Sequence, residues 1–389
     1  MSESPLLMIP GPVEVSPAVA AAMASPPPSH LAPELVEAFG SALENMRRVW
    51  RAAADDQPFV LAGGGTAAME MAAANLVSEG DRVLVVGTGY FSDRMAIILG
   101  RYGAQVLAVE APVGDAPDGE RVRQALGLYG DVRVLFATHV DTSTGVRIDP
   151  APLARLARER GILSVFDGVC ATGGETFEMA EWGADVYLSA SQKALSLPAG
   201  LALQVVSRRA LEGRRRRAGA PPLYFDWEVW RSIMEAYEER RGRYFSTPAT
   251  NLVLALDVGL REILEEGIEE RVAKHQRASV ALRAGWRELG LAPVPVRPDL
   301  AAHTLSALNL PEGVDKSLVA AIGRLGVSVA GGLHTEIADR YFRVGHMGYS
   351  VTRPDWLARV VETVGEALVE KGVEVDPQAA RRAVEGLFP

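Results

Sequence analysis

The sequence contains only four lysines, so a reaction that needs a primary amine has few candidates. Lys274 lies in a charged helical segment, Lys316 begins a helix after an aspartate, and Lys371 ends the last long helix beside a glycine. These three have ordinary explanations at the protein surface. Lys193 instead follows an apolar segment directly and lies between small residues and a Pro-Gly turn. We therefore expect Lys193 to be a buried, functional amine.

Asp167 and residues 63–66 (Gly-Gly-Gly-Thr) also lie where predicted strands end. A carboxylate at the end of a buried strand is unfavourable unless a cation pairs with it, so Asp167 is either functional or a structural cap or salt bridge. The three glycines let the backbone approach an anion, and the following helix supplies a positive N-terminus; a tight turn is the alternative. The segment lacks the GK[ST] of a nucleotide P-loop and the GxGxxG of a dinucleotide site, which makes a nicotinamide-dependent dehydrogenase a weak alternative.

Together these groups match the needs of pyridoxal 5′-phosphate (PLP). This cofactor requires a phosphate cradle, an acid that faces its pyridine nitrogen, and an amine that forms a Schiff base. The acid keeps the nitrogen protonated, so that the ring can accept electrons, and the lysine can move a proton once it is released. Asp167 and Lys193 are 26 residues apart at the ends of adjacent predicted strands, so both can face one ring.

The elements that must position these residues begin at about residue 58, where short apolar segments alternate with helical patterns. Such a pattern indicates a mostly parallel, seven-stranded type of sheet between helices, as in the α/β fold of fold-type-I PLP transferases. Ligands of these sheets bind beyond the carboxyl ends of the strands. The strands are expected at 58–65, 81–87, 104–110, 132–140, 162–169, 184–191 and 201–207. The helices are expected at 34–54, 66–77, 91–103, 152–161, 251–266 and 271–289.

The chain of 389 residues is long enough for two domains. Pro10 and Pro12 prevent a helix near the start, so residues 1–15 are expected to form an extended arm. Residues 16–260 are expected to form the large cofactor-binding domain. Long charged helices and then short strands follow, which predicts a smaller C-terminal α+β domain over residues 261–389.

Charge and cysteine content exclude several kinds of protein. The chain has 40 basic and 49 acidic residues and a net charge of −9, which disfavours binding to nucleic acid or to an anionic membrane. No apolar stretch is long enough to span a bilayer. Cys170 is the only cysteine, so we expect no disulfide framework, no metal site, and a cytoplasmic location in which Cys170 simply packs. The four arginines 214–217 are expected to form a solvated face.

Several segments occur in the order seen in class V aminotransferases, and the chain resembles this family over nearly its whole length. The alanine–glyoxylate / serine–pyruvate aminotransferase group is the most similar. The segments that carry the resemblance are PGP near the start, AGGGTAAME, GTGYFSDR, THVDTSTG, FDGV, SASQKALSLPAG, RYFSTP and YFRVGHMG.

The resemblance implies a role for each matching residue around the cofactor. Lys193 resembles the Schiff-base lysine, and Asp167 resembles the partner of the pyridine nitrogen. Phe91 falls where the family places the aromatic residue that stacks on the ring, often a tryptophan; core packing is the alternative. Thr142 falls where a hydroxyl contacts the ring oxygen. The positions that match the phosphate-binding residues are Gly64, Gly65, Thr66 and Gln192.

The resemblance also implies active sites shared between two subunits. Tyr244 and Thr247 match the pair that reaches the phosphate from the neighbouring subunit, which implies an obligate homodimer. Arg343 matches the arginine that binds the substrate α-carboxylate, a task that suits a planar guanidinium; a surface ion pair is the alternative. Gly11 matches a backbone contact near the substrate. His346 either lines the substrate pocket or completes the core.

We therefore expect a PLP-dependent transaminase that moves an amino group from a small amino acid, alanine or serine, to a 2-oxo acid, glyoxylate or pyruvate. A related transaminase could act on pyridoxamine and pyruvate, on ureidoglycine and glyoxylate, or on aminoethylphosphonate. A non-catalytic module with the same fold is a further alternative, but the presence of Lys193, Asp167 and Arg343 together argues against it. His139 lies beside the expected ring site and either tunes the cofactor or packs.

Overall fold

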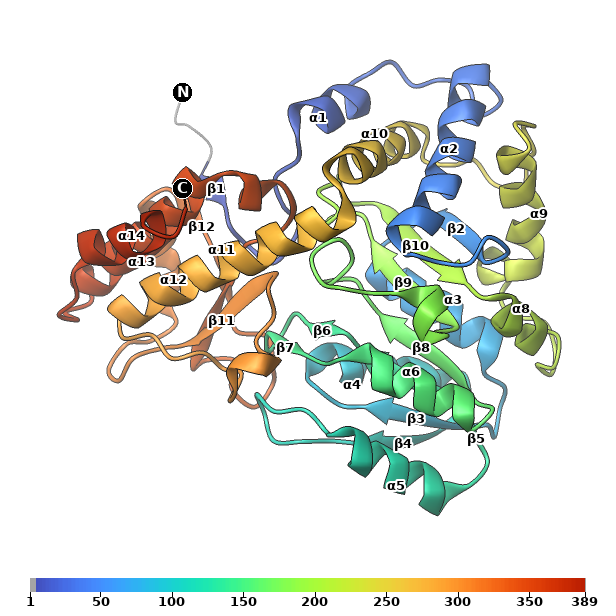
Figure 1. The fold of residues 1–389 in the computed structure, drawn as a ribbon, viewed down its shortest axis with the longest axis horizontal. Helices are drawn as coiled ribbons and strands as arrows, with labels where there is room; N and C mark the ends of the chain where they lie inside the picture. The colour runs from blue at the N-terminus through green and yellow to red at the C-terminus, as the bar shows by residue number, and fades with distance from the viewer. Residues whose placement is uncertain (1–4, 389) are drawn as a thin grey trace.

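The computed structural model describes residues 5–388, and its larger part is built around a seven-stranded sheet (Figure 1). The strand order is β2-β10-β9-β8-β5-β3-β4, and neighbours are parallel except at β10, which is antiparallel to both β2 and β9. Every strand expected from the apolar segments is present, and the predicted mostly parallel α/β sheet is confirmed. The strands are β2 (Gln57–Ala62), β3 (Arg82–Val86), β4 (Gln105–Val109), β5 (Val132–Thr138), β8 (Leu163–Asp167), β9 (Val186–Ala190) and β10 (Leu201–Val206).

Helices cover this sheet, and α2, α3, α4, α6 and α10 lie where the apolar periodicity predicts helices. The helix expected at 34–54 ends earlier, at Val49, and Arg51 just beyond it has a left-handed backbone with φ of 50°. The helices α1, α5, α7, α8 and α9 lie outside the predicted ranges. Of these, α5 and α9 each begin at an aspartate whose side chain accepts a backbone N–H of the first turn. The helices of this part are α1 (Pro17–Met23), α2 (Pro33–Val49), α3 (Gly65–Leu76), α4 (Tyr90–Arg101), α5 (Gly119–Tyr129), α6 (Pro150–Glu159), α7 (Met179–Trp182), α8 (Arg208–Arg214), α9 (Trp227–Glu238) and α10 (Thr250–Glu266).

A second apolar core lies in the C-terminal part, reached along the long helix α11 (Figure 1). The antiparallel sheet of this part has the order β11-β14-β13. Trp286 and Phe342 are among the buried side chains of the second core. No helix within residues 5–388 has both the length and the apolar character needed to cross a bilayer. The elements are α11 (Ile268–Glu288), β11 (Leu305–Asn309), α12 (Ser317–Arg324), β12 (Val327–Ser328), β13 (Ala330–Gly331), β14 (Tyr341–Gly345), α13 (Pro354–Glu370) and α14 (Pro377–Glu385). Two short strands, β6 (Val140–Asp141) and β7 (Val146–Arg147), form a hairpin after β5.

The start of the chain is fixed to this C-terminal core. Strand β1 (Leu6–Leu7) pairs in parallel with β12, and the Gly345 N–H donates to the Met8 carbonyl over 2.7 Å. Leu6 and Met8 are both buried in the second core. The segment that follows, Pro10 and Gly11, is thereby held between the two parts of the molecule, where it meets Lys193.

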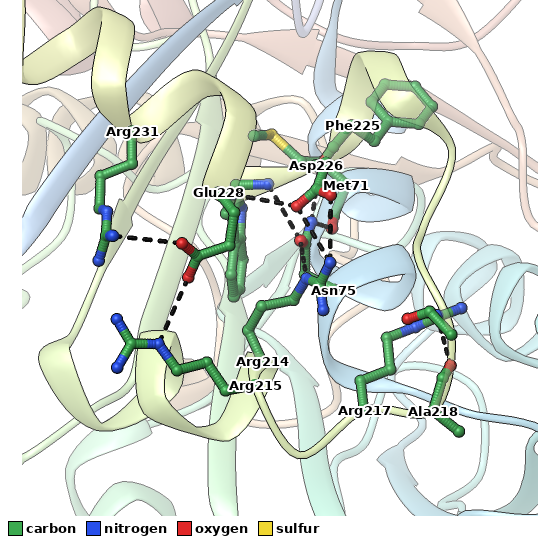
Figure 2. Close-up of polar contacts among 12 residues, drawn as sticks. Met71, Asn75, Arg214, Arg215, Arg217, Ala218, Phe225, Asp226, Glu228 and Arg231 are labelled. Atoms are coloured by element: carbon green, nitrogen blue, oxygen red, sulfur yellow. Dashed lines mark hydrogen bonds and ion pairs between the residues drawn. The ribbon is translucent and has the colours of Figure 1, made fainter.

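The arginines 214–217 do not form a uniformly solvated face, and for Arg214 that prediction is wrong. Arg214 is buried, and Figure 2 shows its guanidinium between Asn75 and Asp226. Its Nε donates to Asn75 Oδ1 over 3.1 Å and its Nη2 lies 3.1 Å from Asp226 Oδ2. Asn75 also accepts the Trp227 N–H, so the cluster fixes the start of α9 on α3. Arg216 is exposed, as expected.

Replacing Arg214 with alanine is expected to lower the apparent unfolding temperature by several degrees. The variant leaves Asp226 buried without its cation, and breaking a buried pair in this way costs about 3–5 kcal/mol. Differential scanning calorimetry measures the change. Arg216→Ala is the matched control, because this neighbouring arginine is exposed, and equal unfolding temperatures for the two variants would contradict the structural role of Arg214.

Candidate active site

A cavity of about 170 Å³ lies beyond the carboxyl ends of the central strands. Its walls come from the segments that follow β2, β3, β5, β8 and β9, which is where open α/β sheets hold their ligands. Most residues expected around the cofactor line this one cavity. The lining residues are Gly65, Thr66, Met69, Phe91, Arg94, Val140, Thr142, Asp167, Val169, Gln192 and Lys193.

The Lys193 amine is buried at the wall of this cavity, with 9% of the residue exposed. Its Nζ donates to the Pro10 carbonyl, which the N-terminal segment supplies. Gly11 has a φ of 89°, and a Cβ there would lie 2.5 Å from Lys193 Cδ, so a larger residue would displace the lysine. Burial lowers the pKa of the amine, and the nearby Arg343 lowers it further, which favours the neutral, nucleophilic form.

The Asp167 carboxyl faces the same cavity from the end of β8. It is 7% exposed, and its Oδ1 accepts the Val169 N–H over 2.9 Å. No ion pair joins it to any residue in the described range 5–388, so the structural salt bridge that the sequence left open is not formed. Burial raises the pKa of Asp167 to about 7, although the Val169 N–H and Lys193 act against this shift. A cation placed against Asp167 would therefore be strongly favoured.

The glycine segment after β2 leads into the N-terminus of α3. Gly64 precedes the helix in an extended conformation, and a Cβ on Gly65 would lie 2.8 Å from the Val169 side chain. Only glycine therefore fits between α3 and the loop that follows Asp167. The first N–H groups of α3 have no carbonyl partner in their own helix, so they favour an anion. Gln192, on the cavity wall, has a buried Oε1 without a hydrogen-bond partner among residues 5–388.

Phe91 and Thr142 are brought together by a buried carboxylate. Asp141 accepts the Phe91 N–H over 3.1 Å and the Ser143 N–H over 2.9 Å. It also accepts the Ser92 N–H over 3.3 Å. The carboxylate thus fastens the start of α4 to the β6–β7 hairpin, so that Phe91 faces the cavity instead of packing in the core.

Arg94 is a cavity residue that the sequence reasoning missed. It lies three residues after Phe91 on α4, and this spacing places the two side chains on one face of the helix. The spacing could have indicated that Arg94 faces the same cavity as Phe91. Its guanidinium lies 4.9 Å from the centre of the Phe91 ring, and its Nη1 donates to Thr66 Oγ1 over 2.9 Å. Arg94 therefore links the stacking residue to the glycine segment and adds positive charge between them.

Arg343 lies in β14 of the C-terminal part and reaches the hairpin beside the cavity. Its Nε donates to the Gly331 carbonyl over 2.9 Å and its Nη1 donates to the Thr142 carbonyl over 3.1 Å. Within residues 5–388 it has no carboxylate partner, so the alternative of a surface ion pair does not apply. Burial lowers the pKa of its guanidinium, as expected for a cation held without a counter-ion.

Tyr244 and Thr247 are not part of this chain's own cavity. Both are exposed, and Tyr244 has 59% of its surface accessible in the irregular segment between α9 and α10. The Tyr244 ring centre lies 5.1 Å from that of His30. Of the predicted site residues, these two are the ones that the single chain leaves on its surface, away from Lys193.

The histidines that the sequence left open both pack in the interior. His139 Nδ1 lies 2.9 Å from the Tyr187 hydroxyl, and burial lowers the pKa of His139 to about 4. His346 Nε2 lies 3.0 Å from Ser306 Oγ, and burial lowers its pKa to about 3. Neither lines the cavity around Lys193, and both are neutral at physiological pH. Cys170 is buried in an apolar cluster beside Val140 and packs, as expected.

Fold and site together define a PLP-dependent enzyme of fold type I. A buried amine and a buried carboxyl, neither of which has an ion-pair partner among residues 5–388, line one cavity that opens onto the N-terminus of α3. The amine fits the aldehyde of that cofactor, the carboxyl fits its pyridine nitrogen, and the first N–H groups of α3 fit its phosphate. Residues 20–353 match the family model of class V aminotransferases. The chain belongs to this family and is an aminotransferase that uses PLP.

Relatives and solved structures agree with this assignment. The chain is 39% identical to "Alanine--glyoxylate aminotransferase 1" of Saccharomyces cerevisiae, over 88% of this chain and 91% of that protein. The structure of ureidoglycine–glyoxylate aminotransferase from Bacillus subtilis superposes with a TM-score of 0.92 at 26% identity, over 100% of this chain and 99% of that one. The alanine–glyoxylate aminotransferase from Nostoc sp. superposes with a TM-score of 0.88 at 32% identity, over 95% and 96%.

Asp167→Asn is expected to stabilise the cofactor-free protein at pH 8 by a few kcal/mol. In the unfolded chain the Asp167 carboxyl ionises near its ordinary pKa of 3.8, whereas in the folded protein it stays protonated up to about pH 7. The unfolded state therefore binds fewer protons in this window, and wild-type stability falls as the pH rises through it. Asparagine removes the buried charge and keeps an acceptor for the Val169 N–H.

Thermal unfolding of the cofactor-free proteins at pH 5 and pH 8 measures this effect. The stability advantage of Asp167→Asn should be larger at pH 8 than at pH 5, and the comparison at each pH separates Asp167 from all other carboxyl groups. An advantage that does not change with pH would contradict the raised pKa.

Proposed function

We propose that this aminotransferase moves the amino group of alanine or serine to glyoxylate or pyruvate. The observation that carries the proposal is Arg343, a guanidinium fixed by two backbone carbonyls beside the cavity and left without a carboxylate partner in the described range. A planar guanidinium matches the α-carboxylate shared by these amino and 2-oxo acids. Relatives that act on such substrates support the pair, including the serine–glyoxylate aminotransferase of Hyphomicrobium methylovorum at 30% identity.

A small, uncharged substrate side chain suits the charges around the cavity. A dicarboxylic donor such as aspartate needs a second cation for its side chain. Arg94 is the one arginine among the described residues that line the cavity, and it is engaged with Thr66 and the Phe91 ring. Arg343, which lies beside the cavity and bonds only to backbone carbonyls among residues 5–388, is the guanidinium that we assign to the α-carboxylate.

The residues around Lys193 have complementary tasks in this proposal. When bound, PLP supplies an electron sink for the substrate Cα. Lys193 holds the cofactor through its amine and, as a neutral base in a buried position, accepts and returns the proton at the substrate Cα. Asp167 holds a positive charge on the pyridine nitrogen, and Phe91 stacks on the ring. Thr142 contacts the ring oxygen.

The phosphate is assigned to Gly64, Gly65, Thr66 and Gln192 of one chain, with Tyr244 and Thr247 of a second chain. The exposure of Tyr244 and Thr247 away from their own cavity supports this arrangement, since an aromatic side chain that is 59% exposed gains by burial against a partner. The enzyme is then a homodimer with shared active sites. Its sole cysteine suits a cytoplasmic location, which fractionation of the native cells would test.

A panel of amino donors and acceptors tests the proposed substrates. With alanine or serine and glyoxylate or pyruvate, kcat/KM should exceed that for aspartate, pyridoxamine, ureidoglycine and aminoethylphosphonate by at least about tenfold. Arg343→Gln should raise the KM of every carboxylate substrate, because it removes the charge that binds them. Preference for a donor without an α-carboxylate, or an unchanged KM in Arg343→Gln, would refute the proposal. Lys193→Ala is the control: it should lose turnover but still bind PLP, as measured by cofactor absorbance after gel filtration.

Mixing two inactive variants tests the shared site. One variant is Lys193→Ala and the other is the double variant Tyr244→Ala, Thr247→Ala. In a mixed dimer, one site combines both defects and the other is native, so random exchange should restore roughly a quarter of the wild-type activity. If Tyr244 and Thr247 served their own chain, mixing would restore none. Sedimentation of the mixture checks that dimers form.

A further inference from the structure

A second cavity lies in the C-terminal part, between α11 and β11. Its volume of about 530 Å³ is in the range of small-molecule sites and exceeds that of the cavity around Lys193. The two cavities share no lining residue, so the larger one is separate from the active site. The aminotransferase reaction described above makes no use of it.

The walls of the second cavity are apolar. Trp286 and Leu291 line the cavity from the core side but are almost wholly buried, with 2% and 4% of their surfaces exposed. The Trp286 indole N–H is already satisfied, because it donates to Ser306 Oγ over 3.1 Å. Pro293 and Val296 are exposed in the same lining, so they present the apolar surface that could hold an aromatic or aliphatic body.

Two arginines of α11 add positive charge to these walls. Arg283 Nη2 donates to the Ala301 and Ala302 carbonyls, each over 2.9 Å, and Arg287 Nε donates to the Arg283 carbonyl over 3.3 Å. Among residues 5–388 neither guanidinium has a carboxylate within ion-pair distance, although most arginines of this chain do. A third arginine of the wall, Arg297, is neutralised by Asp115 and Asp299.

We propose that this cavity is a binding site for a small amphipathic carboxylate, with the apolar body against Pro293 and Val296 and the carboxylate on Arg283 and Arg287. The remaining N–H groups of the two guanidinium groups supply the donors that a carboxylate requires, and the apolar walls strengthen that interaction by excluding water. The adjacent strand β11 pairs with β14 and sets Ala307 opposite Arg343, so a ligand here contacts the strand that supports the active-site arginine. The proposal does not depend on which substrates the enzyme uses.

Calorimetric titration of the PLP-loaded enzyme with 2-naphthoate tests the site. We expect saturable binding of one naphthoate per chain, and binding at least about tenfold weaker for the neutral analogue 2-naphthamide, since a charged hydrogen bond is lost. Arg287→Gln should weaken the binding of naphthoate by a similar factor. Arg324→Gln, an exposed arginine of α12 outside the cavity, is the matched control and should bind as wild type does.

Two further variants keep the outcome decisive. Arg343→Gln removes the active-site cation and should leave naphthoate binding intact, which separates this site from the active site. Val296→Trp places an indole at the rim, where Val296 is 58% exposed, and should block binding without disturbing the core. Absence of saturable binding, equal binding of the amide, or loss of binding in Arg343→Gln but not in Arg287→Gln would overturn the proposal.

Discussion

Two ionisable groups are buried in one cavity without ion-pair partners among residues 5–388, and the rest of the structure must compensate for this. The Lys193 amine and the Asp167 carboxyl are each shifted toward neutrality by burial. Such groups are unfavourable in a folded protein unless the surroundings hold them rigidly. Strands β8 and β9 bring them to one edge of the sheet. Gly11 lets the N-terminal backbone approach Lys193, and Gly65 lets α3 approach Val169, at positions where a Cβ would collide. The fold is thus organised around a site that is complete only when a ligand of matching charge is bound.

Much of the large sheet could be predicted because its strands are continuous apolar segments between recognisable helices. The seven strands of this sheet follow from that pattern alone. Helix α5 could not be predicted in the same way, since it buries only Val122 and Leu126 and its start depends on the Asp118 cap. The burial of Arg214 could not be predicted from the sequence. One of its partners, Asn75, lies 139 residues away along the chain, and the other, Asp226, is brought back to Arg214 only by the irregular segment between α8 and α9.

The candidate site was predictable where its residues belong to contiguous motifs, as Lys193, Asp167 and residues 63–66 do. The role of Asp141 in holding Phe91 depends on how α4 meets the β6–β7 hairpin, which periodicity does not report. The same is true of Arg94 against Thr66. Tyr244 and Thr247 illustrate a different limit. Both are exposed on the surface of the single chain, so a contact that they make with a second subunit depends on the assembly and not on the fold of one chain.

The attachment of the chain's first strand to one of its last has a consequence for biosynthesis. Leu6 pairs with Val327, and Met8 accepts the Gly345 N–H, so neither contact can form until the ribosome has released the C-terminal part. At ordinary translation speeds the delay is on the order of tens of seconds. During that time the C-terminal part does not yet hold the N-terminal segment, whose Pro10 carbonyl accepts the Lys193 amine in the folded protein. The N-terminal wall beside the reactive lysine is therefore among the last parts of the molecule to be fixed in place.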